Sequence, residues 1–148
     1  LNSLVKKIKD INYDFYGFEN KEPIWGDSFY RALVNSKMGL NLSRGLPTKY
    51  YSSNRIASLM GNGLLTFIDR KTQMHDFFNN NEIIFYDNIN DLSDKIKFYK
   101  GNHKSRIKIA KNGKKKYFQL FNELKTTKYI IDKSLGNKTN LYWCVYQL

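Results

Sequence analysis

Short apolar runs and amphipathic segments alternate along this chain, and their alternation predicts strands and helices in turn. Four apolar runs have the length and composition of strands, and polar loops separate them from segments with helical spacing. The predicted strands cover residues 13–16, 38–42, 64–68 and 83–86. This order predicts an α/β fold in which a Rossmann-like parallel sheet is flanked by helices.

Apolar residues at intervals of three and four predict the helices between and after these strands. The predicted helices cover residues 1–10, 27–37, 53–60, 88–99, 103–124 and 127–133, with one or two helical turns within 71–78. Asp27 is the expected cap of the second helix, and Asn88 or Asn90 that of the fourth. We expect one domain over residues 1–135, followed by a tail over 136–148 whose structure the pattern leaves open.

The stretch from Tyr50 to Asp69 reads as a loop, a short helix, a glycine turn and a buried strand. Ser52 and Ser53 are good helix caps, and the strand after the helix is apolar enough to lie at the centre of a parallel sheet. Ligands of open α/β sheets bind at the carboxyl ends of strands, where the N–H groups at helix starts attract anions. The start of this helix is therefore the first place to expect a bound phosphate, although a plain, well-capped crossover helix would have the same pattern.

The net charge of +12 is concentrated in the last third of the chain. Residues 94–148 carry 14 Lys or Arg and 3 Asp or Glu, whereas residues 1–93 are nearly balanced. Such a segment suits nucleic acid, an anionic membrane surface or a solvated helix face. The expected basic face comprises Lys104, Arg106, Lys108, Lys111 and Lys114–Lys116.

A nucleic-acid-binding module is the second interpretation of this basic segment. Lys114–Lys116 are followed by Tyr117 and Phe118, and single-strand binders combine a basic groove with aromatic platforms. These aromatic residues fall on the apolar stripe of their predicted helix, however, and the chain has no recognised nucleic-acid motif. Nucleic acid is therefore not the favoured partner.

The numbers of cysteine and histidine residues and the hydropathy argue against zinc-binding, transmembrane and secreted classes of protein. Cys144 is the single cysteine, and with two His the chain has too few ligands for a structural zinc site, so no metal is expected. No apolar run approaches the length of a transmembrane helix, and no secretory signal is present. We expect a cytoplasmic bacterial protein, peripheral to the inner membrane if the basic face meets lipid. The chain starts without Met, directly on a helical pattern, which suggests a piece of a longer protein.

Five segments in order and at matching spacing resemble the C-terminal, donor-binding domain of family-1-type glycosyltransferases, which have the two-domain GT-B fold. The resemblance extends from Gly17 to about Ile131, roughly three quarters of the chain. The segments read YDFYGF, PIWGDSFYRALVNSKMGLNLSR, NRIASLMGNGLLTFID, MHDFFNNNEIIFYDNINDLSDKI and, after Arg106, IAKNGKKKYF.

The resemblance implies a hexosyltransferase-type enzyme whose donor is a nucleotide-sugar, with no cofactor and no bound metal. It also implies that the acceptor site, and any catalytic base, belong to an N-terminal domain that this chain lacks, so the fragment alone should not turn over. The residues expected at the donor phosphates are Arg44, Lys49, Ser52, Ser53, Asn54 and Arg55. Those expected at the nucleobase, ribose or sugar are Tyr16, Trp25, Ser58 and Asp69.

Two positions depart from the family pattern. When Arg55 and Gly63 are aligned with the family's arginine and glycine, Ser58 replaces the glutamate that typically holds the donor ribose. Tyr50 replaces a carboxylate that many relatives carry eight residues earlier. A hydroxyl group can accept the same hydrogen bond only as a neutral and weaker partner. A non-catalytic glycosyltransferase-like interaction domain is therefore the third interpretation.

Overall fold

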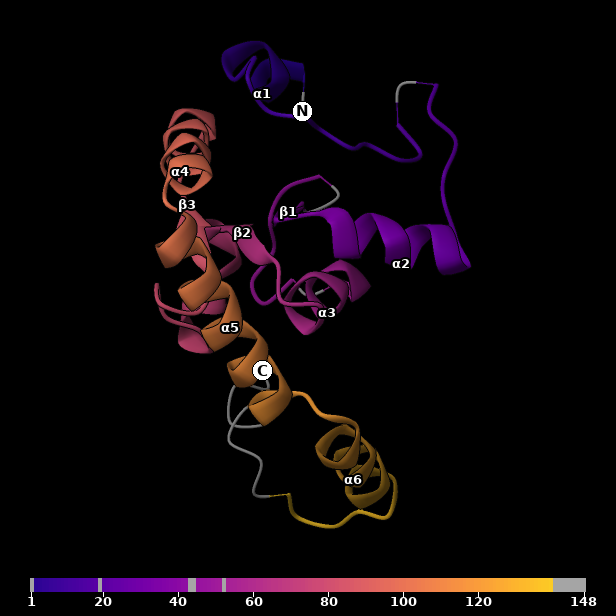
Figure 1. The fold of residues 1–148 in the computed structure, drawn as a ribbon. Coiled ribbons are helices and arrows are strands. Elements are labelled where there is room, and N and C mark those ends of the chain that lie inside the picture. Colours follow the sequence, from indigo (N-terminus) through magenta and orange to yellow (C-terminus); the bar gives the residue numbers. More distant parts are fainter. Residues whose placement is uncertain (1, 19, 43–44, 52, 140–148) are drawn as a thin grey trace.

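The computed structural model describes residues 2–18, 20–42, 45–51 and 53–139. At its centre lies a sheet of three parallel strands in the order β1–β2–β3, with helices packed around it (Figure 1). The strands are β1 (Met38–Asn41), β2 (Leu65–Asp69) and β3 (Ile84–Tyr86). The helices are α1 (Asn2–Lys7), α2 (Gly26–Asn35), α3 (Asn54–Gly61), the 3-10 turns η1 (Arg70–Thr72) and η2 (Met74–Asp76), α4 (Ile89–Gly101), α5 (His103–Leu120) and α6 (Glu123–Ser134). The predicted α/β class is confirmed.

Strand β2 is the centre of the sheet and bonds to a neighbour on each side. It pairs in parallel with β1 from Met38–Leu65 to Asn41–Ile68, and with β3 from Phe67–Ile84 to Asp69–Tyr86. Its first four residues are all buried, so the continuous apolar run reflects burial on both faces of the sheet. The three strand predictions near 38, 64 and 83 are confirmed.

The two faces of the sheet are covered by different helices. Leu65 and Phe67 of β2 pack with apolar residues of α1, α4 and the first half of α5. Ile68 points to the opposite face, where α3, the turns after β2 and the end of α5 close a second cluster. Successive side chains of a strand alternate between faces, so a single buried strand supplies both clusters.

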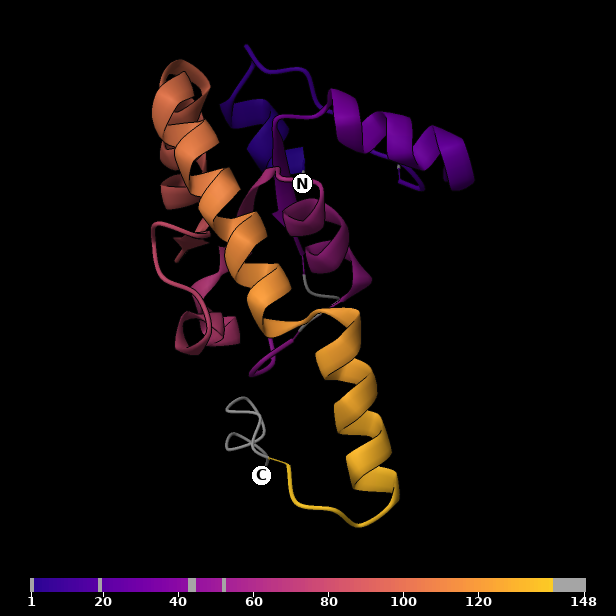
Figure 2. The ribbon, with the colours of Figure 1, turned by 60° about the horizontal axis from the view of Figure 1, so that its bottom comes forward.

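Helix α5 crosses the amino-terminal edge of the sheet. A Cβ atom added to Gly113 would lie 2.1 Å from the carbonyl oxygen of Glu82, just before β3, and one added to Gly63, just before β2, would lie 3.7 Å from the Lys114 side chain. Gly113 is therefore the point at which α5 meets the backbone beneath the strands. Figure 2 shows α5 lying in front of the sheet, and α6 extending beyond it away from the sheet. The carboxyl-terminal edge remains on the side that α5 does not cross.

The strand predicted over residues 13–16 is wrong. This segment has no strand conformation, although Tyr13 packs against the sheet core and stacks on Phe15 at 5.7 Å between ring centroids. An alternating aromatic pattern satisfies packing on one side, but a strand also needs a hydrogen-bonding neighbour. Among the described residues, β1 bonds to β2 alone and not to this segment.

Several helix boundaries differ from the prediction, and two of these differences concern the residues at helix starts. Trp25, and not Asp27, precedes the first residue of α2, and Asp27 instead pairs with Arg31 one turn later. The helix predicted over 103–124 ends at Leu120, because the Asn122 side chain accepts a hydrogen bond from the Lys125 amide and starts α6.

Arg106 does not belong to the solvated basic face that the sequence predicts. It is 7% exposed, and its guanidinium donates hydrogen bonds to the carbonyl groups of Tyr99 and Lys100 at the end of α4. These carbonyl groups have no partner within their own helix, so Arg106 satisfies them and joins α4 to α5. The sequence spacing could not distinguish this structural cation from its solvated neighbours.

Candidate functional site

The carboxyl-terminal edge of the sheet is the candidate site. The three strands end here at Asn41, Asp69 and Tyr86, and their register places these ends side by side. The chain leaving β1 returns to this edge as the start of α3, since Ser53 lies within hydrogen-bonding distance of Asn41. Parallel sheets bind ligands at such edges because loops and helix starts converge there.

Ser53, the residue before α3, does not cap the N-terminus of that helix with its side chain. Ser53 precedes the helix with extended backbone angles, but its hydroxyl does not accept a bond from a helix amide. It donates to Oδ1 of Asn41 across 3.2 Å instead. The first amide groups of α3 therefore retain their capacity to bind an anion, and the helix dipole adds about half a positive charge.

Asn41 is the functional candidate that the sequence interpretation missed. It is 2% exposed, and its Nδ2 atom has no hydrogen-bond partner among the described residues. A buried amide donor without a partner costs about 1–3 kcal/mol, so such a group commonly meets a ligand or an ordered water. A polar residue at the last position of an otherwise apolar strand was the signal that could have revealed it.

Two of the predicted cations lie in this loop region. Arg55, in the first turn of α3, donates from Nη1 to the carbonyl oxygen of Leu42 at 2.7 Å, which ties it to the chain leaving β1. Lys49 is exposed, and its Nζ atom lies 4.8 Å from the centroid of the Tyr50 ring. Arg44 and Ser52, also predicted at the phosphates, lie outside the described residues.

The two positions that depart from the family pattern have partners of their own. The Tyr50 hydroxyl donates a hydrogen bond to Oδ2 of Asp76 at 2.6 Å. Asp76, in η2, therefore brings a carboxylate to the tip of the Tyr50 side chain. Ser58 donates to the carbonyl oxygen of Asn54, one turn earlier in α3. Asn54 is exposed at the first position of that helix.

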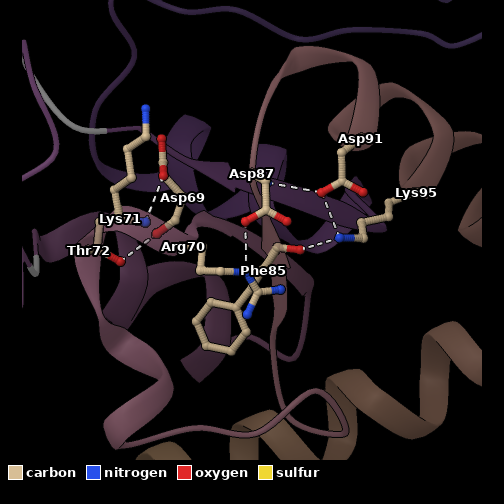
Figure 3. Close-up of polar contacts among 8 residues, drawn as sticks. All are labelled: Asp69, Arg70, Lys71, Thr72, Phe85, Asp87, Asp91 and Lys95. Carbon is tan, nitrogen blue, oxygen red and sulfur yellow. Dashed lines mark hydrogen bonds and ion pairs between the residues drawn. The ribbon is translucent and has the colours of Figure 1, made fainter.

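A network of charged residues joins the ends of β2 and β3 (Figure 3). Arg70 binds Asp87 at 2.8 Å and lies over the Phe85 ring, while Lys95 binds both Asp91 and the Phe85 carbonyl oxygen at 2.7 Å. Asp69 accepts a hydrogen bond from the Lys71 amide and so starts η1. The Arg70–Asp87 pair joins the loop after β2 to the loop after β3 at the carboxyl-terminal edge of the sheet.

Two ionisable groups of this edge have shifted pKa values. Burial raises the pKa of Tyr86 to about 12, and the negative charge of Asp69 adds to that effect. Burial would also raise the pKa of Asp91, but hydrogen bonds from Lys95 and the Asp87 amide, with the charges of Lys95 and Arg70, outweigh it and hold that pKa below its ordinary value. The Tyr86 phenol is thus neutral at pH 7 and Asp91 is ionised.

The aromatic candidates are not brought to this edge. Trp25 is 79% exposed at the start of α2, and α2 begins at its end remote from the sheet (Figure 1). Tyr16, 46% exposed, lies in the irregular segment before α2. Of the predicted residues, the structure groups Ser53, Asn54 and Arg55 at one helix start, with Asp69 at the end of the strand next to β1.

The described part of the chain contains neither a metal-binding cluster nor a helix able to span a membrane. No three His, Cys, Asp or Glu side chains are grouped so that they could hold a metal ion. None of the described helices combines the length and the hydropathy that crossing a bilayer requires.

Comparison with known families identifies this α/β domain. A family model described as "Glycosyl transferase-like" matches residues 2–125. The chain belongs to this glycosyl transferase-like family. The match covers the whole sheet of the glycosyl transferase-like domain and α1 to α5, and it confirms the family resemblance of the sequence motifs. No curated protein and no solved structure matches the chain.

Proposed function

We propose that this glycosyl transferase-like domain binds the diphosphate of a nucleotide-sugar at the N-terminus of α3, as the donor half of an enzyme that transfers a hexose. The observation that carries the proposal is Asn41, whose buried amide donor has no partner among the described residues and lies beside a helix start that Ser53 does not cap. Membership of the family supports a sugar donor as the ligand. An N-terminal acceptor domain and the catalytic base would come from outside this chain, so the domain alone binds without turnover.

The chemistry of glycosyl transfer suits a site of this kind. When the sugar leaves, negative charge grows on the nucleoside diphosphate, and donors that are already aimed at it lower the barrier. The amide groups of α3 and Nδ2 of Asn41 supply neutral donors, while Arg55 and Lys49 supply positive charge. Asp69, at the end of the next strand, would accept a hydrogen bond from the sugar.

The test exchanges the donor of Asn41 for a carboxylate. Asn41→Asp retains the size of the side chain and its acceptor for Ser53, but removes the N–H group and adds a negative charge. Calorimetric titration with uridine and guanosine diphosphates should show at least roughly tenfold weaker binding, because one hydrogen bond to a charged group contributes about 1.5–3 kcal/mol.

Asn80→Asp is the matched control, since Asn80 is exposed in the turn before β3 and its change in charge is the same. Thermal melting of both variants establishes that they fold. Equal affinity of the folded Asn41→Asp variant and the wild type would place the diphosphate elsewhere.

A further inference from the structure

The outer face of α5 is a continuous row of lysines. Helix α5 contains no Asp or Glu, and seven of its exposed residues recur at intervals of three and four, so they lie on one face. We call this set the lysine face: Lys104, Ile107, Lys108, Lys111, Lys114, Lys115 and Phe118. Phe118 and Lys114 of this face lie close to Gly61 and Gly63, at the end of α3 opposite to the proposed donor site.

The positive charge of the lysine face is not neutralised within the described part of the chain. The ion pairs found there lie within α2, α4, α6 and η2 and between the ends of β2 and β3, and none includes a lysine of this face. Lys104 and Lys108, like Lys111 and Lys115, are also like charges four residues apart, which is unfavourable in an isolated helix. An anionic partner would relieve this repulsion.

Two apolar side chains lie among these lysines. Ile107 is 40% exposed and Phe118 is 45% exposed, near opposite ends of the face. An 18-residue helix is about 27 Å long, and its outer side is convex. Such a surface can lie against a flat partner, but it forms no groove that could hold a nucleic-acid strand. A flat anionic surface that also accepts apolar side chains is an anionic lipid bilayer.

We infer that the lysine face of α5 docks this protein on an anionic membrane, with the five lysines at the lipid headgroups and Ile107 and Phe118 in the boundary of the acyl chains. Nucleic acid fits the face less well. Tyr117, which would be needed as a stacking platform beside Phe118, packs into the sheet core with Phe121, and the exposed cations of the face are all lysines. Docking through α5 leaves the carboxyl-terminal edge of the sheet open to a donor.

The first test compares binding of the 148-residue chain to two kinds of vesicle. One is pure phosphatidylcholine, and the other is an equal mixture of phosphatidylcholine and phosphatidylglycerol. Co-sedimentation should detect binding to the mixed vesicles only, and binding should be lost at about 1 M salt, where the Debye length falls to about 3 Å. Equal binding to both vesicles overturns the inference.

The second test locates the docking surface. Each lysine near an anionic surface strengthens binding about fivefold, so reversing Lys108, Lys111 and Lys115 to Glu should weaken it more than roughly a hundredfold. The control reverses three exposed lysines elsewhere and changes the net charge equally: Lys9→Glu, Lys21→Glu and Lys97→Glu. An equal loss in both triple variants would show dependence on net charge alone and would overturn the assignment to α5.

The third test distinguishes lipid from nucleic acid. The double variant Ile107→Ser, Phe118→Ser retains every charge, so it should lower binding to mixed vesicles several-fold and leave binding to a single-stranded oligonucleotide unchanged. Thermal melting checks that all variants fold. If the double variant binds vesicles as the wild type does while the oligonucleotide binds more tightly than the vesicles, the face is a nucleic-acid surface and the membrane inference fails.

Discussion

The Ser53 hydroxyl donates a hydrogen bond to Oδ1 of Asn41 across 3.2 Å, which joins the start of α3 to the end of β1. Ser53 thereby gives up the capping of its own helix. Asn41 in turn has its acceptor satisfied and its Nδ2 donor left without a partner among the described residues. One contact thus leaves both a helix start and a buried donor free for an anion, and this arrangement is the basis of the proposed donor site.

Removal of Lys49 should weaken donor binding if the diphosphate lies over α3. Lys49→Ala deletes a positive charge beside the site. Because a charge-assisted hydrogen bond contributes about 1.5 kcal/mol to the binding free energy, the dissociation constant of uridine diphosphate should rise up to roughly tenfold at low ionic strength. Arg44→Ala should act in the same direction. Calorimetry checks both, with Lys21→Ala as the control. Unchanged affinity in both variants contradicts a phosphate site at this loop.

Replacement of Ser58 by the family's glutamate should restore a contact to the ribose. Ser58→Glu offers a charged acceptor to the ribose hydroxyl groups, so uridine diphosphate should bind roughly tenfold more tightly while inorganic diphosphate does not. Ser58→Gln is the matched control, since it has the same length without the charge. If the Glu and Gln variants bind uridine diphosphate equally, the position does not face the ribose.

Substitution of Gly113 should destabilise the whole domain. In Gly113→Ala the new methyl group would lie 2.1 Å from the Glu82 carbonyl oxygen, so α5 must move away from the sheet. Overpacking of this kind lowers the free energy of unfolding by about 1–3 kcal/mol, measured by urea denaturation. Gly101→Ala is the control, since nothing lies within 4 Å of its added Cβ atom and alanine favours a helix. Equal stability of the two variants would mean that α5 does not pack this closely.

Asp91 should make stability depend on pH in the acid range. Its pKa in the folded protein lies below the unfolded value of about 3.9, so its ionised form stabilises the fold above that pH. The contribution, about 0.5–1 kcal/mol for a partly exposed pair, is lost as the pH falls through the folded pKa. Asp91→Asn should therefore be less stable than the wild type at pH 7 and converge with it below about pH 4.

This convergence is measured by the denaturant midpoints of both proteins over pH 3–7, a range that includes the ordinary pKa of aspartate at about 3.9. Asp94→Asn is the control, because Asp94 is exposed on the same helix. A constant difference between Asp91→Asn and the wild type over the whole range would contradict the electrostatic origin of the effect.

The sequence by itself determined the class of fold and most of its elements. The runs at 38, 64 and 83 became β1, β2 and β3 because their burial on both faces demands continuous apolar residues. Helix periodicity located α3, α4 and α5 to within a few residues, since one face of each helix must meet the sheet. The motifs also identified the family, because they report the same local constraints in the same order.

Only the tertiary structure decided which of these local patterns become contacts. Tyr13–Tyr16 has the pattern of a strand, yet pairing depends on an available strand edge that no local pattern contains. Arg106 has the spacing of the solvated lysines, but it is buried where the end of α4 packs against α5. The pairing of Asn41 with Ser53 depends on how the loop after β1 returns to the sheet. Spacing encodes the face on which a side chain lies, whereas its partner is set by the path of the whole chain.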